Sequence, residues 1–165
     1  MKTLLLLRHA KSSKDDPALR DFDRPLNDRG KDDAKLIGRF IRESSISPDL
    51  VISSPAKRAA KTTELVLKSA GLKINVAFDE RIYEADLHRL LTVISQIESA
   101  RNVAMLVGHN PGFEDLVEVL AGRTTPLPTA SLAQIDLTVE EWNQVRAGAG
   151  KLKWLVTPKD LKKTD

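Results

Sequence analysis

The chain begins with an unbroken run of four leucines, Leu4 to Leu7, which is followed at once by Arg8 and His9. A strand with one exposed face would alternate apolar and polar residues, so this run predicts a strand that is buried on both faces. Open α/β sheets bind ligands at the carboxyl ends of their strands. We therefore expect the strand to end at Arg8, with His9 in the following loop and a chemical site at this edge of the sheet.

Apolar runs and amphipathic stretches alternate along the next hundred residues. Short apolar runs bounded by turn residues predict further strands at 49–54, 73–78 and 102–108. Apolar residues at helical spacing predict helices at 30–45, 55–70, 86–100 and 111–121. Ser54 and Asn110 are expected to cap the second and fourth of these helices, each followed by a proline at the first helical position.

Two later segments, SLAQIDL at 131–137 and KLKWLV at 151–156, alternate apolar with polar residues and predict half-exposed strands towards the sheet edge. No linker or repeat interrupts the order of elements, so we expect one domain over residues 1–165. Strands that alternate with helices predict a three-layer α/β/α sandwich, whose central sheet is mostly parallel with an antiparallel edge strand.

Composition narrows the classes of protein that fit. The chain has 165 residues, of which 41% are hydrophobic, and it has no cysteine, which excludes disulfides and cysteine-ligated zinc. No run approaches the roughly 20 apolar residues of a membrane span, so we expect a cytoplasmic protein with no membrane partner. We also expect a monomer. The net charge is only +3, and the lysines and arginines are scattered among 23 acidic residues instead of forming a basic patch, so nucleic acid is not an expected partner. The basic run KDLKK at 159–163 is expected to be a solvated tail.

A long polar segment, residues 11–30, separates the first strand from the first helix. Its prolines and aspartates forbid a continuous helix or strand. Long irregular segments in compact domains are usually functional or disordered. This one carries Lys11, Lys14, Arg20 and Arg24 directly downstream of His9, so we expect a loop near the site.

Three predicted strand ends carry groups that suit an anion. They are Arg8 with His9, the segment SSPAKR with Arg58, and the segment GHN with His109 and Asn110. In a parallel sheet these ends lie together, and two helix starts would point their free N–H groups at the same crevice. The sum predicts a pocket for a dianion such as phosphate. One neutral imidazole could attack phosphorus, while the other stabilises charge together with the arginines.

No metal or cofactor is expected in this pocket. The chain's three histidines, His9, His88 and His109, lack the spacing of a metal-binding motif such as HEXXH, and the arginines would repel a cation. His88 lies on the predicted third helix between Asp86 and Arg89, where a solvated surface position is expected.

The motifs RHAKS, SSPAKRAAKT and VGHNPG resemble those of the histidine phosphatase superfamily, also called the phosphoglycerate mutase-like family. The segments DFDRPLNDRG, PTASLAQIDL and WLVTPKDL further resemble its SixA-type phosphohistidine phosphatase branch. The resemblance implies that His9 is the phosphorylated nucleophile, that Arg8 and Arg58 bind phosphate, and that His109 completes the pocket. The family usually reads RHG, whereas this chain has Ala10, a departure that recurs in the SixA-like branch.

The resemblance also implies a general acid in the segment DERIYEAD. Glu80, which precedes Tyr83, is the best match, and Glu84 is the alternative. A phosphohistidine substrate leaves as an imidazole, whose protonation is easy near pH 7, so a strong acid is not required for that substrate.

These inferences together predict a metal-free phosphatase that works through a phosphohistidine intermediate. The favoured substrate is phosphohistidine on a signalling or phosphotransfer protein. A small-molecule phosphomonoesterase and a catalytically silent phosphohistidine-binding adaptor remain alternatives. His9 argues against the adaptor, because a binding protein needs the arginines but has no need of a nucleophile.

Overall fold

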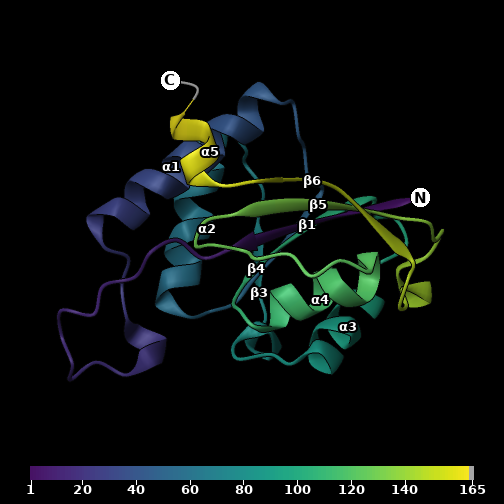
Figure 1. Ribbon diagram of the computed structural model, residues 1–165, viewed down its shortest axis with the longest axis horizontal. Coiled ribbons are helices and arrows are strands. Elements are labelled where there is room, and N and C mark those ends of the chain that lie inside the picture. The colour runs from purple at the N-terminus through teal and green to yellow at the C-terminus, as the bar shows by residue number, and fades with distance from the viewer. Residues whose placement is uncertain (164–165) are drawn as a thin grey trace.

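A six-stranded sheet forms the centre of the computed structural model, which describes residues 1–163 (Figure 1). The strand order across the sheet is β3-β2-β4-β1-β5-β6. The strands are β1 (Lys2–Arg8), β2 (Leu50–Ser53), β3 (Val76–Phe78), β4 (Val103–Gly108), β5 (Leu132–Leu137) and β6 (Gly150–Val156). Residues 164 and 165 of the domain expected over 1–165 lie outside the described part of the chain.

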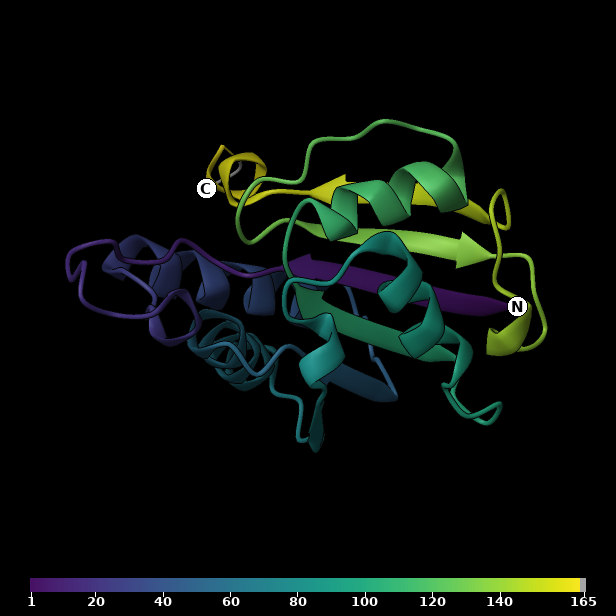
Figure 2. The same ribbon diagram turned by 90° about the horizontal axis from the view of Figure 1, so that it is seen from below.

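Helices cover both faces of this sheet, as the predicted sandwich requires. One face carries α1 (Asp28–Glu43), α2 (Lys57–Ala70) and α5 (Pro158–Lys162), and the other carries α3 (Leu87–Ser95) and α4 (Gly112–Ala121). Figure 2 shows α3 and α4 lying across the near face of the strands. Three short 3-10 helices, η1 (Asp21–Asp23), η2 (Glu80–Ile82) and η3 (Trp142–Gln144), lie in the connections.

The strand that precedes His9, β1, lies in the middle of the sheet and is buried on both faces. Leu4 and Leu6 pack into the core beneath α3 and α4, while Leu5 and Leu7 pack into the core beneath α1 and α2. All four side chains are fully buried. The doubly buried strand predicted from the leucine run is therefore confirmed.

The parallel part of the sheet comprises β1, β2, β3 and β4, whose carboxyl ends lie at one edge. β5 pairs antiparallel with β1, and the edge strand β6 pairs antiparallel with β5, so the expected antiparallel pairing at the edge is confirmed. The predicted alternation is confirmed in both strands. In β5 the apolar residues Ala133, Ile135 and Leu137 are buried while Gln134 and Asp136 are partly exposed, and in β6 Lys151 and Lys153 are exposed.

The helix caps predicted for Ser54 and Asn110 are wrong. α2 begins at Lys57 and α4 at Gly112, and neither has a side-chain cap. Ser54 Oγ instead accepts a hydrogen bond from the Ala56 N–H at 3.2 Å, within the turn that precedes α2. The Asn110 amide donates to the Leu127 carbonyl oxygen at 2.9 Å. Both polar side chains are thus used outside the helices.

Other boundaries differ from the prediction by a few residues, most clearly at β3 and α3, which are shorter than expected. The basic run at 159–163 is not a tail: it forms most of α5, which begins with a capping box between Thr157 and Asp160. The Lys162 ammonium pairs at 2.8 Å with the buried carboxylate of Asp33. The loop of residues 9–27 folds back on itself through a bridge between Ser12 and Leu26. Within residues 1–163, no helix combines the length and the apolar character needed to cross a membrane.

Candidate active site

The sheet register brings the two histidines of the predicted pocket together. Arg8 of β1 pairs with Gly108 of β4, so the residues that follow them, His9 and His109, are neighbours. The His9 N–H donates to the Gly108 carbonyl at 3.0 Å, and its own carbonyl accepts from the Ala130 N–H at 3.0 Å. The imidazole centroids lie 5.1 Å apart. His9 is therefore fixed by main-chain bonds to both sides of β1.

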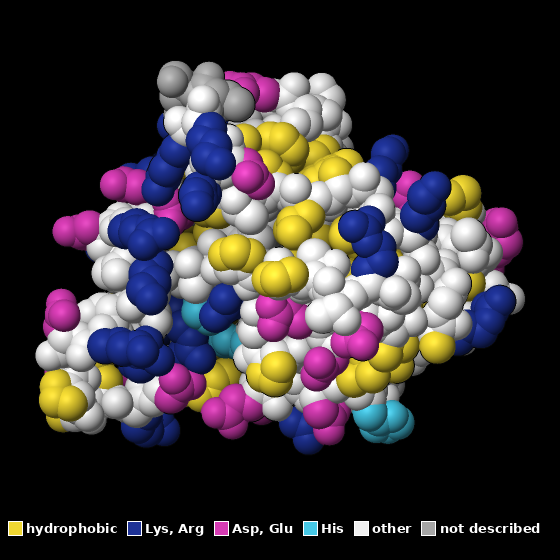
Figure 3. Space-filling view, viewed as in Figure 1, with side chains coloured by type: hydrophobic (Ala, Val, Ile, Leu, Met, Phe, Trp, Pro, Cys, Tyr) yellow, Lys and Arg dark blue, Asp and Glu magenta, His cyan; other side chains and the backbone are white. Residues whose placement is uncertain are grey.

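A polar cavity of about 270 Å³ opens at this carboxyl edge. It is lined by all five residues predicted for the phosphate pocket, namely Arg8, His9, Arg58, His109 and Asn110. Residues of the 9–27 loop, Lys11 and Arg24 among them, complete its wall. Figure 3 shows histidine surface recessed beside a band of Lys and Arg side chains. The five residues thus converge on one cavity whose charged lining residues are positive, and its binding of an anion stays a prediction.

The proton of His9 is fixed on one ring nitrogen. Nδ1 lies 2.8 Å from the Ala10 carbonyl oxygen, which can only accept, so Nδ1 carries the hydrogen. Nε2 then has a lone pair, and it accepts a long hydrogen bond of 3.4 Å from Arg58 Nε. This is the tautomer that a nucleophilic imidazole needs, with Nε2 as the attacking atom.

Burial, joined by the neighbouring cations Arg58, Arg8 and Arg24, lowers the pKa of His9 to about 4, although the hydrogen bond to the Ala10 carbonyl acts in the opposite direction. The imidazole is therefore neutral near pH 7. A protonated ring would have no lone pair with which to attack phosphorus. The positive pocket thus attracts the anion and keeps the nucleophile unprotonated at the same time.

Arg58 projects from the first turn of α2 back over the helix start. Its Nη1 donates to the Asp21 main-chain oxygen at 2.6 Å, and its Nη2 contacts the Asp21 carboxylate at 2.9 Å. Thr62, one turn further along α2, donates to the Arg58 carbonyl at 2.7 Å and accepts from the Ala10 N–H at 3.0 Å. α2, η1 and the His9 loop are therefore tied together at the pocket.

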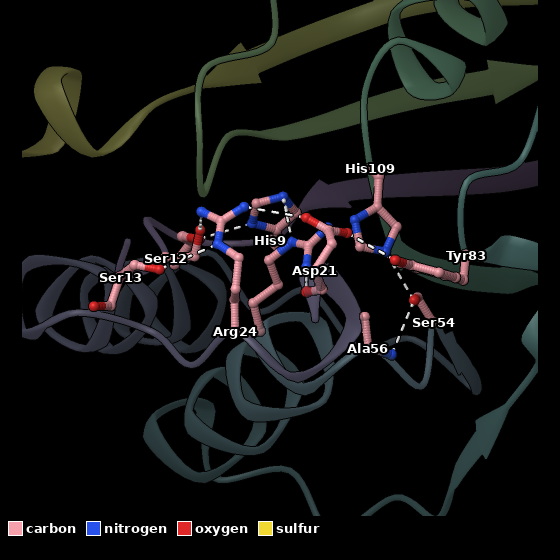
Figure 4. Close-up of polar contacts among 11 residues, drawn as sticks. His9, Ser12, Ser13, Asp21, Arg24, Ser54, Ala56, Tyr83 and His109 are labelled. Atoms are coloured by element: carbon pink, nitrogen blue, oxygen red, sulfur yellow. Dashed lines mark hydrogen bonds and ion pairs between the residues drawn. The ribbon is translucent and has the colours of Figure 1, made fainter. Parts of the chain in front are cut away.

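Asp21 is a member of the site that sequence reasoning missed. Its carboxylate accepts hydrogen bonds from Tyr83 at 2.7 Å and Arg24 at 3.1 Å, besides the contact with Arg58 (Figure 4). Partial burial alone would raise the pKa of Asp21, but the bonds from Tyr83 and Arg58 outweigh it and lower the pKa to about 2. Burial and Asp21 together raise the pKa of Tyr83 to about 12. Asp21 therefore stays ionised at neutral pH, and its carboxylate holds the Arg58 guanidinium in place.

His109 lines the pocket beside His9. Its Nε2 lies 2.8 Å from Ser54 Oγ, and the Tyr83 ring packs edge-on at a centroid distance of 5.5 Å (Figure 4). Burial, with the nearby His9 and Arg58, lowers the pKa of His109 to about 3. If the Ser54 hydroxyl donates to Nε2, the ring proton of His109 lies on Nδ1.

Two buried nitrogens of the pocket residues have no hydrogen-bond partner within residues 1–163. They are His109 Nδ1 and Arg8 Nε. Arg8 is held through its Nη1, which donates to the Leu127 carbonyl at 2.9 Å, the same oxygen that Asn110 binds. Unpaired buried donors are costly, and an acceptor-only ligand such as a phosphoryl group would satisfy them.

The two candidate acids are not brought to the pocket. Glu80 lies in η2 and Glu84 follows it, both with exposed side chains, and neither lines the cavity. Tyr83 is the residue of this segment that reaches the site. The acid role of Glu80 therefore stays a prediction. Within residues 1–163, no group of three His, Asp or Glu side chains is placed to hold a metal ion.

The free energy of unfolding is expected to fall as the pH is lowered from about 6.5 towards about 4. In this window the unfolded chain, with histidine pKa values near 6.5, binds protons at His9 and His109. The folded protein binds few there, because its two values lie at about 4 and about 3. Stability that is present above the unfolded pKa is therefore lost on acidification. Urea denaturation across this pH range measures the slope.

The double variant His9→Gln/His109→Gln is expected to lose less stability over the same window. His88→Gln, on the exposed surface of α3, is the matched control and should keep the wild-type slope. A wild-type slope in the double variant would show that other groups cause the acid sensitivity.

Comparison with known proteins agrees with this geometry. Residues 4–111 match the family profile described as histidine phosphatase superfamily (branch 1). An uncharacterized chloroplastic protein of Arabidopsis thaliana is 31% identical over 95% of this chain and 78% of its own length. Phosphohistidine phosphatase SixA of Escherichia coli is 26% identical, with 96% of each chain covered.

Solved structures show the same architecture. The SixA structure from Agrobacterium tumefaciens superposes with a TM-score of 0.82 at 29% identity, covering 95% of this chain and 98% of that one. A SixA structure complexed with tungstate gives a TM-score of 0.84 at 22% identity, covering 96% and 99%. These likenesses span the whole fold, and the profile match includes every residue of the pocket predicted from the sequence. The chain therefore belongs to the histidine phosphatase superfamily.

Proposed function

We propose that this phosphatase removes the phosphoryl group from phosphohistidine on a protein, through a phosphorylated His9. The observation that carries the proposal is the unprotonated Nε2 of His9, held beside the guanidinium groups of Arg58 and Arg8 in one small cavity. Membership of the superfamily and the likeness to the Escherichia coli phosphohistidine phosphatase support it.

The first step of the reaction transfers the phosphoryl group to the enzyme. Arg8, Arg58 and His109 bind the phosphoryl oxygens, and His9 Nε2 attacks phosphorus while the bond from phosphorus to the substrate nitrogen breaks. The Nδ1–H of His9, bound to the Ala10 carbonyl, keeps the ring oriented as positive charge develops on it. In the second step water attacks phospho-His9, which releases inorganic phosphate and restores the imidazole.

The nature of the leaving group favours phosphohistidine over alkyl phosphates. The carboxylate bound to Arg58 is Asp21, which is held ionised and has no proton to donate at neutral pH. A departing alkoxide needs a proton donor, whereas the free ring nitrogen of phosphohistidine can take up a proton from solvent near neutral pH, so that the group departs as neutral imidazole. The pocket is therefore better suited to breaking a phosphorus–nitrogen bond.

A substrate comparison tests the proposal. Turnover should be measured on a protein phosphorylated on histidine, on free phosphohistidine, and on a panel of phosphorylated sugars and nucleotides. We expect both phosphohistidine substrates to exceed the panel. Faster hydrolysis of any sugar phosphate or nucleotide would establish a small-molecule phosphomonoesterase, and binding of phosphohistidine without turnover would establish an adaptor.

The variant Glu80→Gln is expected to slow phosphohistidine hydrolysis by less than about twofold, because the imidazole leaves without an acid. Rates on phosphohistidine and on an alkyl phosphate should be compared in the same preparation. A loss of about 100-fold confined to the alkyl phosphate would assign the acid to Glu80. Equal losses on both substrates would contradict the acid role, and a selective loss only in Glu84→Gln would transfer that role to Glu84.

A further inference from the structure

A second hollow lies beside α2, apart from the catalytic pocket. It has a volume of about 660 Å³, and its apolar wall consists of Pro25, Leu26, Ala60 and Phe78. Phe78, at the end of β3, is 57% exposed although it is a large apolar residue. An exposed aromatic ring beside a concave surface is typical of an interface that another molecule covers.

The hollow continues along α2 towards the sheet edge. A neighbouring cavity of about 500 Å³ shares Ala60, Glu64 and Phe78 with the first, and Leu72 and Val76 line its far part. We call these two connected hollows the α2 groove. Its length along the helix indicates a protein surface as the occupant, because small-molecule sites enclose their ligands more completely.

The rim of the α2 groove is positively charged. Five lysines line it: Lys31, Lys57, Lys61, Lys68 and Lys73. Among the described lining residues the only carboxylate is Glu64, and it is already paired with Lys61 at 2.8 Å. No ion pair within residues 1–163 involves any of the other four lysines. An apolar floor inside a rim of unpaired cations is complementary to an apolar side chain flanked by carboxylates.

The groove and the catalytic pocket share a wall. Arg24 lines the pocket and Pro25 the groove, while Arg58 lines the pocket and Lys57 the groove. Successive Cα atoms are about 3.8 Å apart, so the two sites are separated by little more than one residue of chain. Figure 2 shows the loop of residues 9–27 lying beside α2, which η1 of this loop contacts. A protein that places a side chain in the pocket would also cover the groove.

We propose that the α2 groove docks an acidic protein whose phosphohistidine enters the catalytic pocket, an inference that rests on the phosphohistidine phosphatase activity proposed above. Charge complementarity identifies the partner as acidic. A second copy of this chain, whose net charge is +3, would bring further positive charge to the lysine rim. Lys11 and Lys14, at the mouth of the pocket, extend the same positive surface on the other side of the shared wall.

The test compares groove variants on a docked and an undocked substrate. The docked substrate is a histidine phosphotransfer domain of negative net charge, phosphorylated on its histidine, and the undocked substrate is free phosphohistidine. For Phe78→Ser and Lys57→Glu we expect kcat/KM on the phosphorylated domain to fall about tenfold, chiefly through KM. On free phosphohistidine we expect a change of less than about twofold, because neither residue lines the pocket.

Two control variants separate docking from general damage. Phe78→Leu keeps an apolar side chain and should restore most of the activity on the domain. Lys151→Glu makes the same charge change as Lys57→Glu and should behave as wild type. Lys151 lies near the start of β6 and is aligned with Thr3 at the start of β1, so it lies at the end of the sheet away from the pocket. Equal losses on both substrates, or unchanged activity on the domain, would overturn the docking proposal while leaving the phosphatase proposal intact.

A binding measurement keeps the test independent of turnover. The phosphorylated domain is titrated into His9→Ala and into His9→Ala/Phe78→Ser, and we expect the second Kd to be about tenfold weaker. Equal Kd values would overturn docking even if the wild-type enzyme proved inactive on phosphohistidine, an outcome that would defeat the phosphatase proposal separately. A change from dimer to monomer caused by Phe78→Ser would identify the occupant as a second copy and overturn the acidic partner.

Discussion

Replacing His9 with alanine is expected to lower turnover on phosphohistidine by at least about a thousandfold. The loss should be this large because His9 Nε2 is the attacking atom, and the other neutral imidazole of the pocket, His109, has its Nε2 engaged with Ser54 Oγ. Rapid quenching at alkaline pH with labelled substrate should trap an acid-labile phosphoenzyme in the wild type. The same experiment on His9→Ala should give no labelled protein.

His109→Ala provides the comparison. We expect it to remain phosphorylated, since His9 is intact, but to form and lose the label more slowly. A labelled His9→Ala protein, or one that keeps more than about a thousandth of wild-type turnover, would place the nucleophile elsewhere.

Replacing Arg58 with alanine is expected to lower kcat/KM by about 100- to 1000-fold, the usual range for a group that stabilises developing charge in a transition state. The change removes the cation beside the attacking nitrogen and the Nε–H that contacts it. The affinity for orthovanadate, which mimics five-coordinate phosphorus, should fall in parallel with kcat/KM.

Arg58→Lys and Asp21→Asn show how the arginine acts. Lysine keeps the charge but has no planar fork, so it should recover only part of the activity. Asp21→Asn keeps the main-chain oxygen that binds Arg58 Nη1 and should cost much less than Arg58→Ala. Unchanged vanadate affinity in Arg58→Ala would mean that the arginine serves folding rather than phosphate binding.

The pocket could be predicted from the sequence because its residues stand at strand ends. The apolar runs before Arg8 and His109 define where β1 and β4 stop, and parallel pairing then places His9 beside His109. Arg58 follows from the same rule, since it lies in the first turn of the helix after β2. For these residues, topology alone decides the neighbourhood.

The remaining site residues depend on contacts that local pattern does not encode. Ser54 has the sequence context of a helix cap, but its hydroxyl lies 2.8 Å from a histidine that follows it by 55 residues. Asp21 meets Arg58 across 37 residues, from a loop without periodicity. In the sequence, Asp21 stands out only as part of the segment DFDRPL, which indicates the family but does not show that Asp21 contacts Arg58. The side-chain direction of Glu80 could not be predicted, because in an irregular segment it does not follow from spacing.

The central position of β1 also affects how the protein is made. Both strands that flank β1 are distant in the sequence: Thr3 pairs with Val103, and Leu4 with Ile135. The strand that precedes the nucleophile is therefore synthesised long before either neighbour leaves the ribosome. Until then its four leucines and both of its edges lack their partners, a condition that favours aggregation and chaperone binding. In this fold, an early-synthesised nucleophile becomes functional only when the late strands arrive.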